Sequence, residues 1–358
     1  MKTFKNLWDQ FISFENLYLA SINSQKGKRW KSSTLQFNSQ IENELFLLQE
    51  ELINDSYRPG EYASFVIKEP KERVIYAAPY RDRIVHHALM NILEPIWEPC
   101  LYFHSYACRV NKGTHKALDT CQTFLRKNKY VLKCDIQKYF PSIDHTILKD
   151  IIRNKIADKQ ILHLLDIIID SSPEKIGYRT PINYFSGDNI FTPLEKRSGI
   201  PIGNLTSQFF ANIYLNELDK WIKEEMKIKY YLRYMDDFII FHQSKTVLHQ
   251  LRLAIHKFLD GLRLILHNKK QEIFPVKNGV PFLGFHIFYQ NRRLLKSNLR
   301  LFKKRMKTKQ QLYLNGEINQ DEIKQSIMAW LGHSRHGDTF NLRKMVFQDM
   351  VFIKGLNV

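Results

Sequence analysis

Three aspartates at the ends of apolar segments predict metal chemistry. Asp135 follows YVLKC, and Asp236 and Asp237 follow YYLRYM. A carboxylate at the end of a buried strand is costly unless it is paired or bound to a cation. A lone aspartate in such a place usually caps a helix or forms an ion pair. Two such places together suggest a divalent-cation site, and hard carboxylate oxygens suit Mg²⁺.

The two adjacent aspartates cannot play the same part within a regular strand. Because strand side chains alternate between the two faces of a sheet, Asp236 and Asp237 point in opposite directions there. A tight turn at the Asp-Asp step relaxes this restriction without removing it. We therefore expect Asp135 and Asp236 to hold the ions, with Asp237 as a weaker ligand or a positioning group.

The segments that must position these acids read as strands among helices. We predict strands over 130–136, 230–237, 237–242 and 281–288. Helical periodicity is found over 114–127, 145–155, 160–170, 206–226 and 245–262. Strands embedded among helices, with one tight hairpin, indicate an α+β domain and not a doubly wound parallel sheet.

The first hundred residues show a second pattern. Residues 1–55 read as helical, with a polar, basic break over 24–40. Residues 62–76 predict a short hairpin, and 82–97 a helix whose pattern stops near Pro95.

Composition limits the class of protein. The 358 residues include 54 Lys and Arg against 36 Asp and Glu, a net charge of +18. A charge this far from zero is typical of proteins with a polyanionic partner. The four cysteines form no Cys-x-x-Cys pair, and no apolar stretch is long enough for a signal peptide or a membrane span. We therefore expect a cytoplasmic chain with reduced thiols and no membrane partner.

The C-terminal tail is especially basic. Residues 291–358 contain 14 Lys and Arg and 5 Asp and Glu, and no acid lies between 292 and 309. Cations alternate there with apolar residues, which is typical of a helix that packs on one face and follows phosphates with the other. The candidate nucleic-acid contacts are Arg292, Arg293, Lys296, Arg300, Lys303 and Lys304. A solvated charged face is the alternative interpretation.

These motifs resemble the reverse transcriptases. YMDD at 234–237 is similar to their Tyr-x-Asp-Asp hairpin, and Asp135 in LKCDIQKYFPSID is similar to their first palm aspartate. The other blocks of the family follow in the same order, over roughly residues 57–290. They are RVIYAAPYRDRIVHHALMNILEPIWE, FHSYACRVNKGTHKAL, SGIPIGNLTSQFFANIYLNELD, LRLILHNKK and PFLGFHIF.

The resemblance implies a fold and a reaction. The fold is a right-hand polymerase, with fingers and an antiparallel palm sheet over 57–290 and a basic helical thumb over 291–358. A helical extension over 1–56 precedes them. The reaction is RNA-directed DNA synthesis from deoxynucleotides on a primer, with two Mg²⁺ ions, for which Mn²⁺ is a possible substitute. Asp135, Asp236 and Asp237 would be the catalytic and metal-binding residues, and the backbone carbonyl of Ile136 would be an extra ligand.

The same resemblance assigns candidate nucleotide contacts. Lys68 and Arg73 would bind the triphosphate, and an arginine suits bidentate phosphate contacts; a solvated hairpin tip is the alternative. Phe140 would lie under the sugar and exclude a 2′-hydroxyl, or else simply pack in the core. Lys270 would donate a proton to the departing pyrophosphate, or else be an ordinary surface lysine. Ile202, Gly203 and Gln208 of the fourth block complete the set.

A finer feature of the fourth block points to a subgroup. Many reverse transcriptases have Pro-Gln-Gly there, whereas this chain has Pro201-Ile202-Gly203, followed by Asn204 and then by Ser207-Gln208. This pattern resembles the enzymes of diversity-generating retroelements, as does AWLGHSRHGDTFNLRK at 329–344. Those enzymes copy a template RNA into cDNA with errors at adenines, and they work with a small basic accessory protein.

Two other functions stay open at this point. A defence-associated (anti-phage) reverse transcriptase would make cDNA from a non-coding RNA without an adenine bias. A non-catalytic RNA-binding scaffold would keep only the polymerase shape, although such a scaffold has no use for three carboxylates beside a polyanion. For Ile202, ordinary packing in another reverse transcriptase lineage is the alternative to a role in fidelity.

Overall fold

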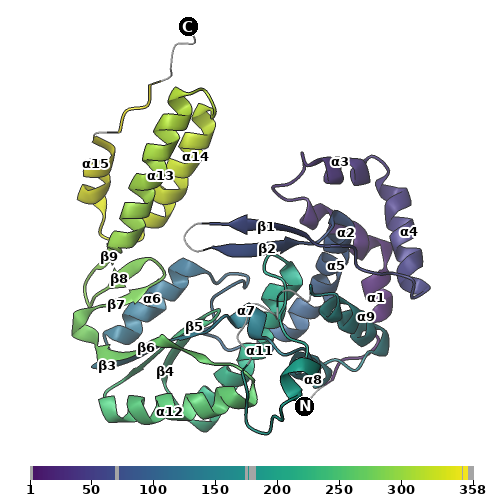
Figure 1. The fold of residues 1–358 in the computed structure, drawn as a ribbon, viewed down its shortest axis with the longest axis horizontal. Coiled ribbons are helices and arrows are strands. Elements are labelled where there is room, and N and C mark those ends of the chain that lie inside the picture. Colours follow the sequence, from purple (N-terminus) through teal and green to yellow (C-terminus); the bar gives the residue numbers. More distant parts are fainter. Residues whose placement is uncertain (1–2, 69–71, 174–175, 177–182, 349, 354–358) are drawn as a thin grey trace.

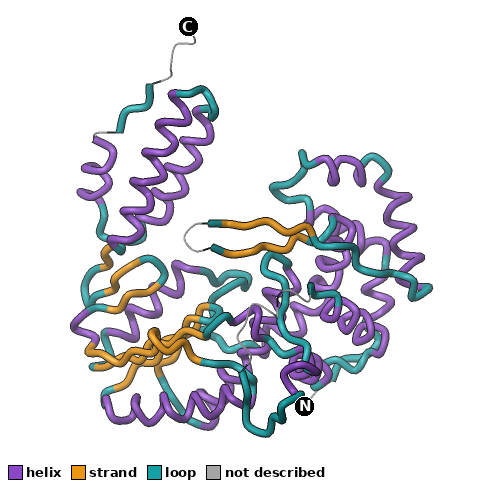
Figure 2. Tube along the Cα trace, viewed as in Figure 1, coloured by secondary structure: helices purple, strands orange, loops and turns teal. Residues whose placement is uncertain are grey.

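The computed structural model describes residues 3–68, 72–173, 176, 183–348 and 350–353, and the largest sheet among them has four antiparallel strands, at the lower left of Figures 1 and 2. The strands are β3 (Tyr130–Ile136), β4 (Tyr230–Tyr234), β5 (Asp237–His242) and β6 (Leu266–Pro275). Their order is β4-β5-β3-β6, so β3, which contains Asp135, and β5, which begins at Asp237, are neighbours. The predicted strands at 130–136 and 237–242 are confirmed residue for residue.

Alternation places the two faces of this sheet in different cores. Leu132, Cys134 and Ile240 pack in the larger core, which extends over α5 (Tyr80–Trp97), α11 (Leu205–Lys220) and α12 (Lys245–Gly261). Val131 and Ile239 pack instead in a second core, with α6 (Thr114–Leu125) and the C-terminal elements. Asp135 is separated from Val131, and Asp237 from Ile239, by an even number of positions. Because strand residues two apart point to the same side, both aspartates lie on this second face.

The first quarter of the chain forms helices and a hairpin. The helices are α1 (Trp8–Ile12), α2 (Phe14–Ser24), α3 (Ser32–Asn38) and α4 (Ile41–Ile53). The hairpin pairs β1 (Ala63–Ile67) with β2 (Arg73–Ala77), and in Figure 1 it extends from these helices toward the C-terminal helices. Its tip at 69–71 lies outside the described residues.

One expectation for this part of the chain is corrected. The break at 24–40 contains α3, because Thr34 and Phe37 are buried and the helix forms despite the polar surroundings. The helix predicted over 82–97 is confirmed as α5, which ends at Trp97. Pro95 does not interrupt it, since proline removes only its own backbone bond and the Glu98 N–H still donates to the Glu94 carbonyl.

In the ranges that the structure describes, four further helices lie between β3 and α11 along the chain. They are α7 (Tyr139–Ser142), α8 (His145–Arg153), α9 (Lys159–Asp170) and α10 (Thr192–Glu195). The predicted helices over 114–127, 145–155, 160–170 and 245–262 are confirmed within a few residues at their ends. The helix over 206–226 closes with a π-helical turn, Trp221–Glu225.

The region after residue 280 differs most from expectation. The strand predicted over 281–288 is two strands, β7 (Val280–Phe282) and β8 (Phe285–Ile287), because Leu283 and Gly284 have φ of +44° and +89° and reverse the chain. A third strand, β9 (Arg292–Leu294), pairs with β8. The basic tail therefore begins as a strand, and its helix α13 (Lys296–Leu314) starts four residues later than expected.

Helices α13, α14 (Gln320–Ser334) and α15 (Phe340–Gln348) form the C-terminal bundle. Phe302 of α13 stacks on Trp330 of α14 with ring centroids 4.2 Å apart, and Phe347 of α15 contacts both rings. The segment between α14 and α15 fastens this bundle to the small sheet, because Asp338 exchanges two hydrogen bonds with the backbone of Arg292.

The fold confirms the predicted α+β right-hand arrangement of hairpin fingers, antiparallel palm and helical thumb. The boundaries at 56 and 290 stay predictions. Within the described part of the chain, no helix is both long and apolar enough to span a lipid bilayer.

Candidate active site

The centre of the site is a cross-strand pair of carboxylates. Asp135, the sixth residue of β3, lies directly opposite Asp237, the first residue of β5. Residues opposite each other in an antiparallel pair have Cβ atoms about 5 Å apart, on the same face of the sheet. The register therefore brings together two acids that are 102 positions apart in the sequence.

Asp236 lies in the tight turn between β4 and β5. Met235, just before it, has a φ of +56°, the left-handed conformation that lets the strand reverse at once. The Asp236 carbonyl accepts a hydrogen bond from the N–H of Ile136 at 3.3 Å. This bond ties the turn to β3 beside Asp135, so all three acids lie at one end of the sheet, as the sequence predicts.

Burial and the neighbouring carboxylates raise the pKa values of Asp236 and Asp237. Burial raises the pKa of Asp237 to about 6; Lys133 opposes this rise, and the Asp135 and Asp236 carboxylates add to it. Burial also raises the pKa of Asp236, with Asp135 adding to the rise. Crowded carboxylates of this kind attract a cation, since a positive charge between them relieves the repulsion.

Two observations test whether these acids fit magnesium. Oδ1 of Asp237 is enclosed and has no hydrogen-bond partner among the described residues. Among the same residues, no three or more His, Cys, Asp or Glu side chains lie together so that they alone could hold a metal ion. Mg²⁺ in polymerase sites is usually bound by one or two carboxylates together with substrate phosphates and water. The acids present fit that open arrangement rather than a closed cage.

Lys270 reaches the same carboxylates from β6. Cys134 pairs with Gln271 and Ile136 with Leu266, so residues 267–270 of β6 lie opposite Asp135 alone. This irregularity re-aims the strand, as bulges commonly do next to active sites. The Lys270 ammonium donates a hydrogen bond of 2.7 Å to Oδ2 of Asp135.

The hairpin brings one of its two predicted cations toward the acids. Arg73, at the start of β2, is exposed and close enough for its charge to lower the pKa of Asp236, which burial raises. Lys68 follows directly after β1 and is exposed. It lies one position beyond Ile67, the cross-strand partner of Arg73.

The loop before α11 contacts strand β2 of the hairpin. The Ile202 carbonyl accepts a hydrogen bond of 3.0 Å from the N–H of Tyr76 on β2. Gly203 has a φ of +122°, and a Cβ there would lie 2.9 Å from Cγ2 of Ile75 and 3.1 Å from the Tyr76 carbonyl oxygen. The backbone of this loop can approach the hairpin only because residue 203 is glycine.

The other predicted nucleotide contacts lie on neighbouring elements. Phe140, on α7, is partly buried against the larger core, and its carbonyl accepts from the N–H of Ile200 at 3.0 Å. Gln208 is half-buried in the first turn of α11. Ile136 has a fully buried side chain, so only its backbone can serve the site. Their proposed roles stay predictions.

The basic tail divides into two groups. Lys296, Arg300, Lys303 and Lys304 are exposed on α13, while Phe302 and Met306 on its other face are buried. Arg293 is exposed on β9, with its guanidinium 5.4 Å from the centre of the Phe288 ring. Arg292 differs from the rest, because its guanidinium is bound to Asp119 and Gln122 of α6 and so fastens the small sheet to that helix.

Two charged groups near the site were missed by sequence reasoning. The Lys133 ammonium lies 3.4 Å from Oδ2 of Asp237, on the same face of the sheet. Arg233 of β4 is completely buried and forms an ion pair with Asp219 of α11. Both interrupt apolar strands, and a charged side chain in a buried strand requires a partner for the same reason that the aspartates do.

The chain is similar in sequence to several known proteins. The family model described as reverse transcriptase (RNA-dependent DNA polymerase) matches residues 66–287. Protein YkfC of Escherichia coli (strain K12) is 26% identical over 290 residues, covering 70% of this chain and 72% of YkfC. The group II intron-encoded protein LtrA of Lactococcus lactis subsp. cremoris is 26% identical over 223 residues, covering 62% of this chain and 34% of LtrA.

A solved structure is also similar. Apo telomerase from Candida tropicalis, truncated from its C-terminal domain, aligns with a TM-score of 0.45 and 16% identity, over 66% of this chain and 55% of that one. The chain thus spans most of YkfC but about a third of LtrA.

Proposed function

The chain belongs to the reverse transcriptase family of RNA-directed DNA polymerases, and from this premise we propose that it copies a template RNA into cDNA by two-metal nucleotidyl transfer. The observation that carries the proposal is the register of β3 and β5, which sets Asp135 opposite Asp237, next to Asp236 in the turn. Neither a scaffold nor an RNA-binding module needs three crowded carboxylates beside an anionic ligand.

The metal ions would be held by Asp135 and Asp236, with Asp237 and the Ile136 carbonyl as further ligands. When bound, Mg²⁺ or a substituting Mn²⁺ would activate the primer 3′-hydroxyl and stabilise the leaving oxygen. Arg73 would bind the triphosphate of the incoming deoxynucleotide from the hairpin, with Lys68 beside it. Lys270 is the candidate proton donor for the departing pyrophosphate, and its Nζ already lies beside Asp135.

The walls of the site would select and hold the substrates. Phe140 would exclude a 2′-hydroxyl at the sugar, while Ile202, Gly203 and Gln208 line the nucleotide from the loop before α11. The exposed cations of α13 would follow the phosphates of the template RNA and the primer. Such contacts bind any sequence and weaken as salt increases.

We further propose that the biological context is a diversity-generating retroelement. Support comes from Ile202 in place of the glutamine, from the Gly203-Asn204 and Ser207-Gln208 pattern, and from the segment at 329–344. The partner set would then include a small basic accessory protein, and the errors would concentrate opposite template adenines.

The test is primer extension by the full chain on a defined RNA template, with Mg²⁺ and all four deoxynucleotides, followed by sequencing of the products. Asp236→Asn is the blank. Extension by the wild type alone, with errors concentrated opposite adenines, supports both proposals. Extension with low and evenly distributed errors overturns the diversity-generating assignment and favours a defence role. Equal yields from the wild type and Asp236→Asn, with the cognate RNA and accessory protein added, overturn the polymerase itself.

A further inference from the structure

A buried ion pair lies directly behind the turn that carries Asp236. Arg233 of β4 and Asp219 of α11 both have side chains that are 0% exposed. The guanidinium binds the carboxylate through two nitrogens, with Nε at 2.8 Å from Oδ1 and Nη2 at 2.6 Å from Oδ2. The Tyr231 hydroxyl donates to the same carboxylate at 2.5 Å.

The guanidinium of Arg233 is charged despite its burial. Burial lowers the pKa of Arg233, but the Asp219 carboxylate more than offsets this effect, so the pKa of Arg233 is raised above its usual value. An apolar pair of similar volume would often be no less stable at such a position. The ion pair therefore calls for an explanation other than stability, and its remaining contacts supply one.

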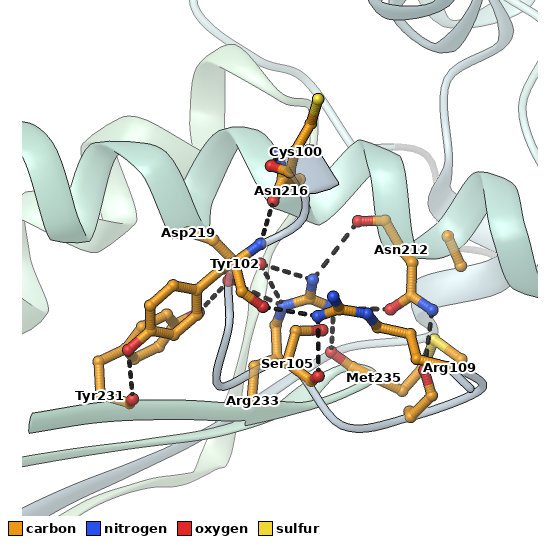
Figure 3. Close-up of polar contacts among 12 residues, drawn as sticks. Cys100, Tyr102, Ser105, Arg109, Asn212, Asn216, Asp219, Tyr231, Arg233 and Met235 are labelled. Carbon is orange, nitrogen blue, oxygen red and sulfur yellow. Dashed lines mark hydrogen bonds and ion pairs between the residues drawn. The ribbon is translucent and has the colours of Figure 1, made fainter. Parts of the chain in front are cut away.

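The third guanidinium nitrogen of Arg233, Nη1, contacts the turn that carries Asp236. Nη1 of Arg233 donates to the Met235 carbonyl at 3.1 Å and to Oδ1 of Asn212 at 3.3 Å (Figure 3). Met235 is the residue with the left-handed φ of +56°. Asp236 thus has the carbonyl before it held by Arg233 and its own carbonyl held by the N–H of Ile136.

The same arginine also holds the loop behind the sheet. Its backbone N–H donates to the His104 carbonyl, and its carbonyl accepts from the N–H of Tyr106, both at 3.0 Å. Asn212 extends the network by donating to the Ala107 carbonyl at 2.9 Å. Helix α11, the 104–107 loop and the Met235 turn therefore meet at Arg233, the first and last through its side chain and the loop through its backbone.

We propose that Arg233 is a positioning residue that sets the place of the Asp236 carboxylate, with Asp219 orienting its guanidinium. This inference deepens the proposed polymerase function and rests on it. Arg233 itself is behind the sheet's catalytic turn and contacts none of the three acids' carboxylates in the described structure. A planar fork is required, because a lysine in its place cannot bind Asp219 and the Met235 carbonyl at once.

The test compares Arg233→Lys with a matched control, Arg109→Lys. The bonds described for the Arg109 side chain go to Glu98, Tyr102 and Ser105, so it fixes the same loop without contacting the turn, through an ion pair whose arginine is also buried. For the wild type and both variants we would measure thermal stability, kcat, the KM for deoxynucleotide and the Mg²⁺ concentration at half-maximal rate. Hydrogen exchange would be followed in peptides covering 130–142 and 230–242.

Arg233→Lys should lower kcat by about tenfold or more, since small displacements of a reacting group have large effects on rate. It should raise the Mg²⁺ requirement and accelerate exchange at the Ile136 amide, with little change in KM. Arg109→Lys should keep kcat within about twofold at a similar loss of thermal stability. Equal kcat losses in the two variants, or unchanged exchange at Ile136 in Arg233→Lys, would overturn the proposal.

Two further arms keep the test decisive. If Arg233→Lys does not fold, Tyr231→Phe removes one bond to Asp219 and should produce a smaller loss of kcat in the same direction; an unchanged kcat and exchange rate count against the proposal. If the wild type extends primer no better than Asp236→Asn, the polymerase function fails. The exchange measurement then still decides whether Arg233 fixes the turn.

Discussion

The ammonium of Lys270 lies 2.7 Å from Oδ2 of Asp135, at the bulge where β6 loses its regular pairing with β3. The lysine thus places a positive charge at the edge of the carboxylate group, and it lowers the pKa of Asp236, which burial raises. In the proposed function, the same ammonium would donate a proton to the departing pyrophosphate.

This relationship predicts that Lys270→Met lowers kcat by about 10²-fold, the lower end of what a general acid contributes. Lys270→Arg should lose less, because the charge is kept. Single-turnover primer extension measures the effect. Lys269→Met, an exposed neighbour in the same bulge, is the matched control and should stay within about twofold. Equal effects of the two methionine variants would contradict the prediction.

Arg73 should act on substrate binding rather than on folding. Arg73→Ala is expected to raise the KM for deoxynucleotide by about tenfold, because a charge-assisted contact worth about 1.5–3 kcal/mol is removed. Arg73→Lys should recover part of the loss. Steady-state extension with varied nucleotide concentration checks this. Arg153→Ala is the control, because Arg153 forms a surface ion pair with Asp166. A normal KM in Arg73→Ala would show that the residue is only a solvated hairpin cation.

Gly203→Ala should damage both the site and the stability of the protein. The added Cβ meets Ile75 and the Tyr76 carbonyl oxygen, and the φ of +122° is strained for alanine, so we expect a loss of about 1–3 kcal/mol. Urea unfolding and primer extension would both report it. Gly261→Ala, at the end of α12 with open space around it, should be neutral or slightly stabilising.

Ile202→Gln should raise fidelity. An amide restores one polar contact near the incoming nucleotide, worth about 0.5–1.5 kcal/mol, which corresponds to a several-fold change in discrimination. Sequencing of extension products should show fewer errors opposite adenines, while Ile202→Leu, which stays aliphatic, keeps the wild-type spectrum. An unchanged error spectrum in Ile202→Gln would leave ordinary packing as the explanation of this residue.

We expect the free energy of unfolding to decrease in mild acid, because His86 is buried in its neutral form. Burial lowers the pKa of this fully enclosed imidazole to about 3, with His87 and Arg83 adding to the shift. In the unfolded chain His86 therefore binds a proton near pH 6.5, whereas in the folded chain it stays neutral down to a much lower pH. The stability that depends on neutral His86 is therefore complete above pH 6.5 and decreases by up to about 1.4 kcal/mol per pH unit below it. Urea titrations at pH 7, 6 and 5 should show a weaker pH dependence for His86→Gln than for the wild type. The exposed His163→Gln should change nothing.

Much of the site could be predicted from the sequence because its signals are local. A run of apolar residues that ends in a carboxylate reveals both the strand and the unfavourable charge, so Asp135, Asp236 and Asp237 could be identified before any contact was known. The same holds for the hairpin with Arg73 and for the amphipathic α13, since periodicity reports which face of an element is buried.

Only the tertiary structure decided which of these groups meet. Asp135 lies opposite Asp237, Lys270 reaches Asp135 through a bulge, and Arg292 turns away from the basic surface to bind Asp119. Arg233 interrupts an apolar strand, but its ion pair with Asp219 behind the Met235 turn depends on how α11 packs against β4. The local sequence pattern determines which secondary structure a segment prefers and which of its faces is buried. Partners are determined by strand register and helix packing, which are set by contacts between residues far apart in the chain.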